Sequence, residues 1–181
     1  SLQFARMSDT IPTTPQNTMW FFGKHELDID DKRRLQIPAA WRPSARDELG
    51  KRLGVELVLL ISKVKDDPFA CLTAMPMSVF EAHFQARAAE MSTMLGDKAE
   101  RLRRYLSVRT EKVTLDSAGR VLIPAWIAEK VGVFPKGGGD GCNQVVLFGE
   151  QDRFKIWNRA KYEEYERSEA NDDFSDVSNF I

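Results

Sequence analysis

The sequence is poor in the residues that bind metals or form disulfides. Its 181 residues include two cysteines and two histidines. Cys71 and Cys142 are far apart and lie among apolar neighbours, which favours two reduced thiols in a core over a disulfide. Neither His25 nor His83 stands at metal-ligand spacing from a cysteine. We therefore expect no metal site and no other cofactor.

Long hydrophobic runs are also missing. The longest, Val55–Ile61, contains Glu56 and is far too short to cross a bilayer. No signal peptide is visible, and Ser1–Arg6 resembles a cloning remnant ahead of a natural start at Met7. These absences indicate a cytoplasmic protein that does not act at a membrane.

Catalytic signatures are a third absence. The glycine-rich segment Pro135–Gly141 lacks the Lys-Ser/Thr ending of a phosphate-binding loop, and it precedes a strand-like run instead of a helix. Neither histidine has a nucleophile in its sequence context. The sequence thus argues against an enzyme.

The formal net charge of −1 is low for a protein that binds nucleic acid, because such domains are usually basic. The charge is unevenly distributed, however. Residues 161–181 hold seven acids and two bases, a balance of −5, so the rest of the chain carries +4. Lys32, Arg33 and Arg34 form a compact basic triplet within that part. A local basic surface is therefore compatible with the neutral average.

Hydrophobic periodicity predicts both strands and helices, and therefore an α+β fold. The expected strands are 20–29, 35–37, 55–63, 69–74, 108–115, 121–123, 144–148 and 154–157. The expected helices are one from Pro38 that Pro43 interrupts, then 76–95, 97–106, 124–131 ended by Gly132, and one capped by Asn158 that runs to 170. Residues 1–18 are polar with two prolines and predict a disordered arm.

An apolar stripe marks the long helix expected over 76–95. Its members recur at spacings of four, four, three and four, as one face of a helix requires. They are Phe80, Phe84, Ala88, Met91 and Leu95. Core packing, between the two halves of the chain or against a neighbouring subunit, is the preferred interpretation. An exposed stripe would instead imply a partner helix.

One segment occurs twice. Residues 30–39 read DDKRRLQIPA and residues 116–125 read DSAGRVLIPA, so Asp, Arg, Ile, Pro and Ala coincide at a constant offset of 86. Such repetition indicates duplication of one supersecondary unit that cannot bury its apolar face alone.

The Asp-x-x-x-Arg part of the repeat predicts a tight hairpin. Gly119 supplies a residue for the left-handed conformation that a short hairpin with a bulge requires. Asp116 can accept turn N–H bonds and hold Arg120 at the hairpin tip. A fixed guanidinium on a two-stranded ribbon suits a phosphate or a guanine edge in the major groove. For Arg120, an Asp116–Arg120 pair that only stabilises the turn is as good an explanation as DNA binding. For the first copy, the cluster of cations at Lys32–Arg34 favours DNA binding.

With these residues the sequence resembles the MraZ family, bacterial proteins built from two SpoVT–AbrB-type units. The resemblance spans roughly residues 21–162, and two Asp-x-x-x-Arg copies, each followed by Ile-Pro, make it specific. The matching segments are Phe21-x-Gly23, Asp30-x-x-x-Arg34-Leu-x-Ile-Pro38, Val113-x-Leu-Asp116-x-x-Gly119-Arg120-x-Leu-Ile-Pro124, and Val145-Val-Leu-x-Gly149-x-x-x-x-Phe154-x-Ile-Trp157.

The resemblance implies two tandem SpoVT–AbrB-like ββαββ-type units with helices between and after them. The first unit would span 20–75 and the second 107–158. Residues 76–106 would connect them, and a C-terminal helix over 159–170 and an acidic tail over 171–181 would follow.

The resemblance also implies a nucleoid-associated regulator of the bacterial division and cell-wall gene cluster. It would assemble as a homo-oligomeric ring and bind double-stranded DNA at repeated promoter sites. By motif, Asp30, Arg34, Asp116 and Arg120 would lie at the DNA-facing rim, and Lys32 matches a basic position of the first motif.

Arg33 departs from the family pattern, which has glycine at this position. If the first hairpin keeps the shape of the second, Arg33 has φ > 0 at a cost of roughly 1–2 kcal/mol, and a third cation at a DNA-facing tip would compensate. The alternative is a relaxed turn with Arg33 at negative φ.

Two other functions compete with DNA binding. The protein could be a ring that restrains a partner enzyme through its acidic C-terminal region, although such charge runs usually just solvate a helix. An antitoxin-like unit fits the expected fold but not the duplicated architecture.

Overall fold

The structure of the chain is a computed structural model that describes residues 19–42, 54–94, 96–137 and 143–170. The expected N-terminal arm, the acidic tail, Cys142 and the helix restart after Pro43 lie outside these residues. Cys71 is buried and carries a free thiol, and burial raises its pKa to about 12. A thiol in that environment stays protonated and behaves as a small apolar core residue.

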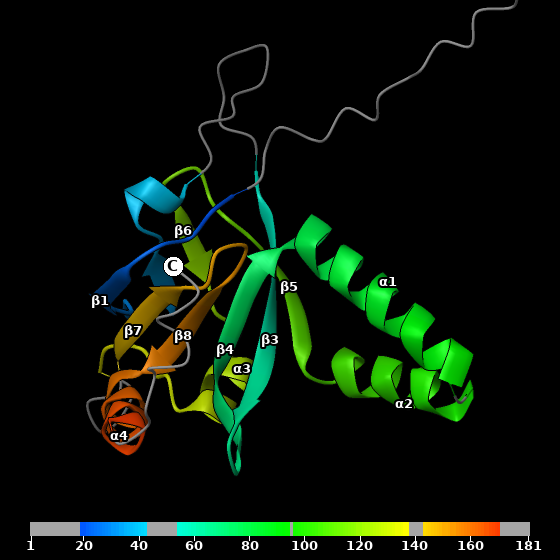
Figure 1. Cartoon of the computed structure of the whole chain (residues 1–181). Coiled ribbons are helices and arrows are strands. Elements are labelled where there is room, and N and C mark those ends of the chain that lie inside the picture. Colours follow the sequence, from blue (N-terminus) through cyan, green and yellow to red (C-terminus); the bar gives the residue numbers. More distant parts are fainter. Residues whose placement is uncertain (1–18, 43–53, 95, 138–142, 171–181) are drawn as a thin grey trace, which may run out of the picture.

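The fold is α+β, with a mostly antiparallel sheet and four α-helices in the described residues (Figure 1). Six strands form the main sheet in the order β1-β7-β8-β4-β3-β5, and every neighbouring pair is antiparallel. The strands are β1 (Lys24–Asp28), β3 (Glu56–Val64), β4 (Asp67–Pro76), β5 (Thr110–Thr114), β7 (Gln144–Gly149) and β8 (Phe154–Asn158).

Both halves of the chain contribute to this one sheet. β1, from the first half, pairs with β7, and β3 pairs with β5 from the second half. The halves also share one hydrophobic core, because its buried cluster contains Leu57 and Leu59 from the first half and Val145 and Leu147 from the second. Long apolar runs in β3 and β4 supply its centre, as expected for strands covered on both faces.

A smaller two-stranded ribbon stands apart from the main sheet. It pairs β2 (Arg34–Gln36) with β6 (Arg120–Leu122), the strands that follow the two Asp-x-x-x-Arg segments. The 3₁₀ helix η1 (Ala39–Trp41) follows β2, where the sequence predicts a longer α-helix. Trp41 anchors this region, since its indole Nε1 donates to the Phe22 carbonyl at 2.9 Å and its ring packs edge-on against Phe21.

The short helix α3 (Ala125–Val131) follows β6 and ends at Gly132, as predicted. Gly132 has a φ of 73° and its N–H contacts the carbonyls of the last helical turn, a common helix ending. The C-terminal helix α4 (Arg159–Glu169) begins at Asn158, whose side chain accepts from the Lys161 N–H at 3.1 Å. That confirms the predicted cap.

The helices α1 (Met77–Met94) and α2 (Gly96–Ser107) form a hairpin that extends from the β3–β5 side of the sheet (Figure 1). Phe80 and Phe84 stack on each other with ring centroids 6.1 Å apart, but both are half-buried, less than core packing predicts. They line a cavity of about 230 Å³ together with residues of β3 and α2. The side chains of Met91 and Leu95 lie outside the described residues. Among the described helices, none has the length and apolar character to span a membrane.

Candidate nucleic-acid interface

The ribbon brings the two copies of the repeat into direct contact. Its register pairs Arg34 with Leu122 and Gln36 with Arg120. Because side chains alternate along a strand, these four residues share one face of the ribbon. Leu35 and Val121 point to the other face and are buried in the core at 0 % and 1 % exposure. The core thus fixes which face of the ribbon is presented outward.

Asp30 organises the first hairpin tip. Its Oδ1 accepts the backbone N–H groups of Lys32 at 2.8 Å and Arg34 at 2.9 Å, and its Oδ2 accepts Nε of Arg34 at 2.6 Å. Partial desolvation acts to raise the pKa of Asp30, but the hydrogen bonds from Arg34 and Lys32 together hold that pKa below its ordinary value. The carboxylate therefore stays charged and holds the guanidinium in place.

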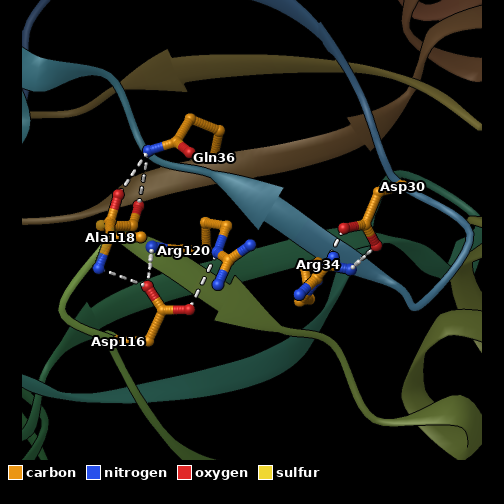
Figure 2. A network of polar contacts seen from close by, with 7 residues as sticks. Asp30, Arg34, Gln36, Asp116, Ala118 and Arg120 are labelled. Carbon is orange, nitrogen blue, oxygen red and sulfur yellow. Dashed lines mark hydrogen bonds and ion pairs between the residues drawn. The ribbon is translucent and has the colours of Figure 1, made fainter.

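Asp116 repeats this arrangement in the second hairpin. Oδ1 accepts the N–H groups of Ala118 and Arg120, both at 2.9 Å, and Oδ2 accepts Nε of Arg120 at 2.9 Å. Desolvation again acts to raise the pKa of Asp116, and the bonds from Arg120 and Ala118 outweigh it and lower the pKa. Figure 2 shows both Asp–Arg pairs, one from each hairpin.

The two hairpins hold each other as well as themselves. The N–H of Ile37 donates to the carbonyl of Gly119, and the N–H of Ile123 donates to that of Arg33, each at 2.9 Å. The side-chain nitrogen of Gln36 reaches across to the carbonyls of Ala118 and Gly119 at 3.0 and 3.2 Å (Figure 2). Each strand is thus bonded to the tip of the other hairpin. The two copies of the repeat are related to each other by approximate two-fold symmetry.

The backbone at the two tips has the same conformation. Gly119 has a φ of 79° and Arg33 has a φ of 62°. Of the two shapes considered for the first hairpin, the left-handed one is therefore correct. A residue with a Cβ pays for this conformation in strain, roughly 1–2 kcal/mol.

The predicted DNA-contacting residues fall into two groups in the structure. Arg34 and Arg120 are partly exposed and each is paired with its aspartate, with side-chain exposures of 30 % and 35 %. Lys32 is exposed at the first tip, and Arg33 is half-buried against the second hairpin. Sequence reasoning missed Gln36 and Leu122, although period-two alternation from the buried Leu35 and Val121 places both on the outer face.

Within the described residues, no group of three or more His, Cys, Asp or Glu side chains is arranged to hold a metal ion. The chemistry available at the ribbon is therefore that of arranged cations, amides and one exposed apolar side chain.

Comparison with known proteins places the sequence in a family. A family model described as “MraZ protein, putative antitoxin-like” matches residues 106–179. A protein of Nitrosomonas europaea named “Transcriptional regulator MraZ” is 31 % identical over 143 residues, covering 79 % of this chain and 84 % of the relative. The chain belongs to the MraZ family.

Other MraZ relatives match a similar share of the chain at a similar identity. The “Transcriptional regulator MraZ” of Moorella thermoacetica is 32 % identical over 145 residues, or 80 % of this chain and 85 % of the relative. That of Neisseria meningitidis serogroup A is 31 % identical over 79 % of this chain and 83 % of the relative. The matched range, residues 106–179, includes the second hairpin with Asp116 and Arg120.

Proposed function

We propose that this protein is a DNA-binding transcriptional regulator that contacts double-stranded DNA with the outer face of the β2–β6 ribbon. One observation carries the proposal: a single exposed face bears Arg34 and Arg120, each fixed by an aspartate of its own hairpin. The name “Transcriptional regulator MraZ” of the relatives supports the same function. The tandem SpoVT–AbrB-like interpretation of the two halves belongs to this proposal, with the ribbon as their shared element.

The geometry suits recognition of base edges in the major groove. A two-stranded ribbon fits that groove, and arginine binds guanine O6 and N7 through two nitrogens. In both hairpins Nε donates to the aspartate. Within the described residues, the two terminal nitrogens of each guanidinium have no hydrogen-bond partner and can face a ligand. An arginine already held in position loses less conformational entropy on binding, which strengthens each contact.

Several copies of the ribbon in an oligomer, binding several copies of a DNA site, would supply the affinity that a single near-neutral chain lacks. We propose a homo-oligomeric ring whose ribbons bind repeated promoter sites, those of the division and cell-wall gene cluster, in the nucleoid of the cytoplasm. Linked binding events raise the overall affinity through effective concentration without any new contact.

The test uses a promoter fragment that carries the repeats upstream of the organism's own division gene cluster. Wild type should bind it in a salt-dependent manner. Arg34→Ala/Arg120→Ala should bind it much more weakly while still folding, with only a modest drop in melting temperature from loss of the two partly exposed Asp–Arg pairs. Lys32→Ala should also weaken binding without unfolding the protein. Equal binding by wild type and the double variant would remove the ribbon from the DNA site.

The alternative, restraint of a partner enzyme through the C-terminal region, finds less support. Several acids of α4 are engaged within the chain: Glu166 pairs with Lys24 at 3.1 Å, and Glu163 pairs with Arg159 at 3.0 Å. These pairs leave less free charge on α4 to attract a basic partner. Deletion of residues 171–181 tests it, because loss of a protein partner with intact DNA binding would favour this second function.

A further inference from the structure

The approximate two-fold symmetry of the hairpins pairs two tip positions that hold different residues. The left-handed position is Arg33 in the first hairpin and Gly119 in the second. Arg33 uses its own side chain, whose Nε donates to the carbonyl of Ile123 at 3.3 Å. Gly119 has no side chain for the corresponding bond. Even so, the equivalent carbonyl, that of Ile37, accepts Nε of Arg42 at 2.9 Å.

Arg42 therefore occupies the place that the missing side chain leaves. A Cβ built on Gly119 would lie 2.5 Å from Cδ, 2.7 Å from Nε and 2.8 Å from Nη1 of Arg42. Such distances are shorter than real Cβ contacts allow, so Arg42 packs directly against the second tip. At each hairpin tip, a guanidinium thus donates to the carbonyl of an isoleucine that precedes a proline, Ile123 or Ile37. It comes from the tip residue in one hairpin and from the end of η1 in the other.

These two guanidinium groups differ from Arg34 and Arg120 in their charge environment. Arg34 and Arg120 are each neutralised by an aspartate. Over residues 19–42, 54–94, 96–137 and 143–170, Arg33 and Arg42 donate to carbonyl oxygens and form no ion pair with a carboxylate. Each is half-buried and held by a single Nε bond. No carboxylate of the described residues therefore neutralises either charge.

We propose that Arg33 and Arg42 are a matched pair of phosphate-contacting residues, one at each hairpin tip. Arg34 and Arg120, on the outer face of the ribbon, address the base edges. The proposal rests on the DNA-binding function proposed above and adds Arg42 to the interface. Phosphate contacts fix the register of a protein on DNA, whereas base contacts give specificity. An unpaired cation releases more bound counterions from DNA than one already neutralised by a carboxylate, which suits Arg33 and Arg42 to the first role.

The experiment measures binding to a mixed-sequence DNA duplex at several salt concentrations, because phosphate contacts do not depend on base sequence. Arg42→Ala is compared with Arg101→Ala, which removes the same charge from an exposed position on α2. Removal of one phosphate-binding cation should reduce the salt slope by about 0.9 per bound subunit, or about eightfold in affinity per decade of salt. Arg101→Ala should keep the wild-type slope.

A compensating variant tests the equivalence of the two arginines. Arg42→Ala/Gly119→Arg moves the guanidinium to the tip residue, as in the first hairpin, and should recover the salt slope that Arg42→Ala loses. Gly119→Arg alone should destabilise the fold, because its side chain collides with that of Arg42. If Arg42→Ala does not fold, Arg42→Lys and Arg42→Gln replace it, with the slope kept by lysine and reduced by glutamine.

The outcomes separate this inference from the function on which it rests. Wild type that binds no duplex, mixed-sequence or promoter, overturns the proposed function itself. Wild type that binds while Arg42→Ala keeps its slope overturns only the role of Arg42. Weaker binding with an unchanged slope also overturns it, since Arg42 would then only position the tip. Equal salt slopes for Arg42→Lys and Arg42→Gln would likewise overturn the role of Arg42 as a phosphate contact.

Discussion

Arg33 has a φ of 62°, and a side chain with a Cβ rarely adopts that conformation. We predict that Arg33→Gly stabilises the protein by about 0.5–1 kcal/mol, because relief of strain is partly offset by loss of the Nε bond to Ile123. The same change should weaken DNA binding, since it removes one cation from the first tip. Urea unfolding and duplex titration measure the two effects. Stability that is unchanged or lower in the variant would contradict the prediction, because the strain at the tip would then be no larger than the contribution of the Nε bond.

The two tip aspartates predict a dependence of stability on pH. The pKa of Asp30 and that of Asp116 are lowered from an ordinary value of 3.8, so both carboxylates favour the folded state when ionised. Their contribution is present above the unfolded pKa and is lost as pH falls through the folded one. The free energy of unfolding should therefore decline more steeply below about pH 4 in wild type than in Asp30→Asn/Asp116→Asn. Parallel curves for the two proteins would contradict this.

The side chain of Asn158 links the start of α4 to the end of α3, so its substitution tests how these elements are held together. It is 5 % exposed, its side-chain oxygen caps α4 through Lys161, and its side-chain nitrogen donates to the carbonyl of Gly132 at 2.8 Å. Asn158→Ala loses the cap and a buried hydrogen bond, and we expect it to destabilise the fold by about 2 kcal/mol.

Asn158→Ser is the matched control. Its hydroxyl keeps an oxygen that can cap α4 and it loses the donor to Gly132 without adding a charge, so thermal and urea unfolding should place it between wild type and Asn158→Ala. Equal stability of the two variants would show that the cap contributes nothing measurable to α4.

Agreement between expected and observed elements is closest where local signals are strong. The helix after Pro124, its end at Gly132 and the cap at Asn158 are as predicted, because proline, glycine and asparagine act within one turn. The helix expected after Pro38 is the three-residue η1 instead. Trp41 there is drawn into the core by Phe21 and by the bond to the Phe22 carbonyl, contacts that no local pattern encodes.

The exposed aromatic residues matter at the scale of the whole molecule. Trp20 and Phe22 are 51 % and 63 % exposed, and their rings are parallel with centroids 6.1 Å apart. Phe80 and Phe84 are half-buried beside a cavity. Such apolar surface is compatible with the proposed ring, in which neighbouring subunits would cover it.

The ring makes a quantitative prediction about DNA length. A fragment with several repeats should bind more tightly than a single repeat by roughly 10²–10⁴-fold, because the second and later contacts are intramolecular. Native mass spectrometry of the same sample gives the subunit count, and duplex titration gives the affinities. A monomeric protein, or equal affinity for one repeat and several, would contradict the proposal of a ring on repeated sites.

Some features of this protein follow from the sequence alone. The constant offset of 86 between residues 30–39 and 116–125 establishes the repeat, and each aspartate determines its hairpin through bonds to residues two and four positions later. These interactions are local, so the spacing of residue types is enough to predict them. The family followed from the same motifs.

Other features were decided only by the tertiary structure. That β2 pairs with β6, and so brings Arg34 and Arg120 to one face, depends on contacts between residues 84 to 88 positions apart. The same holds for Arg42, which no motif marks and which reaches the second tip only because the two halves share a core. Burial of Leu35 and Val121 selects the outward face, and burial is a property of the whole fold. Pairings of this kind depend on which distant surfaces exclude water together, and a linear pattern does not specify them.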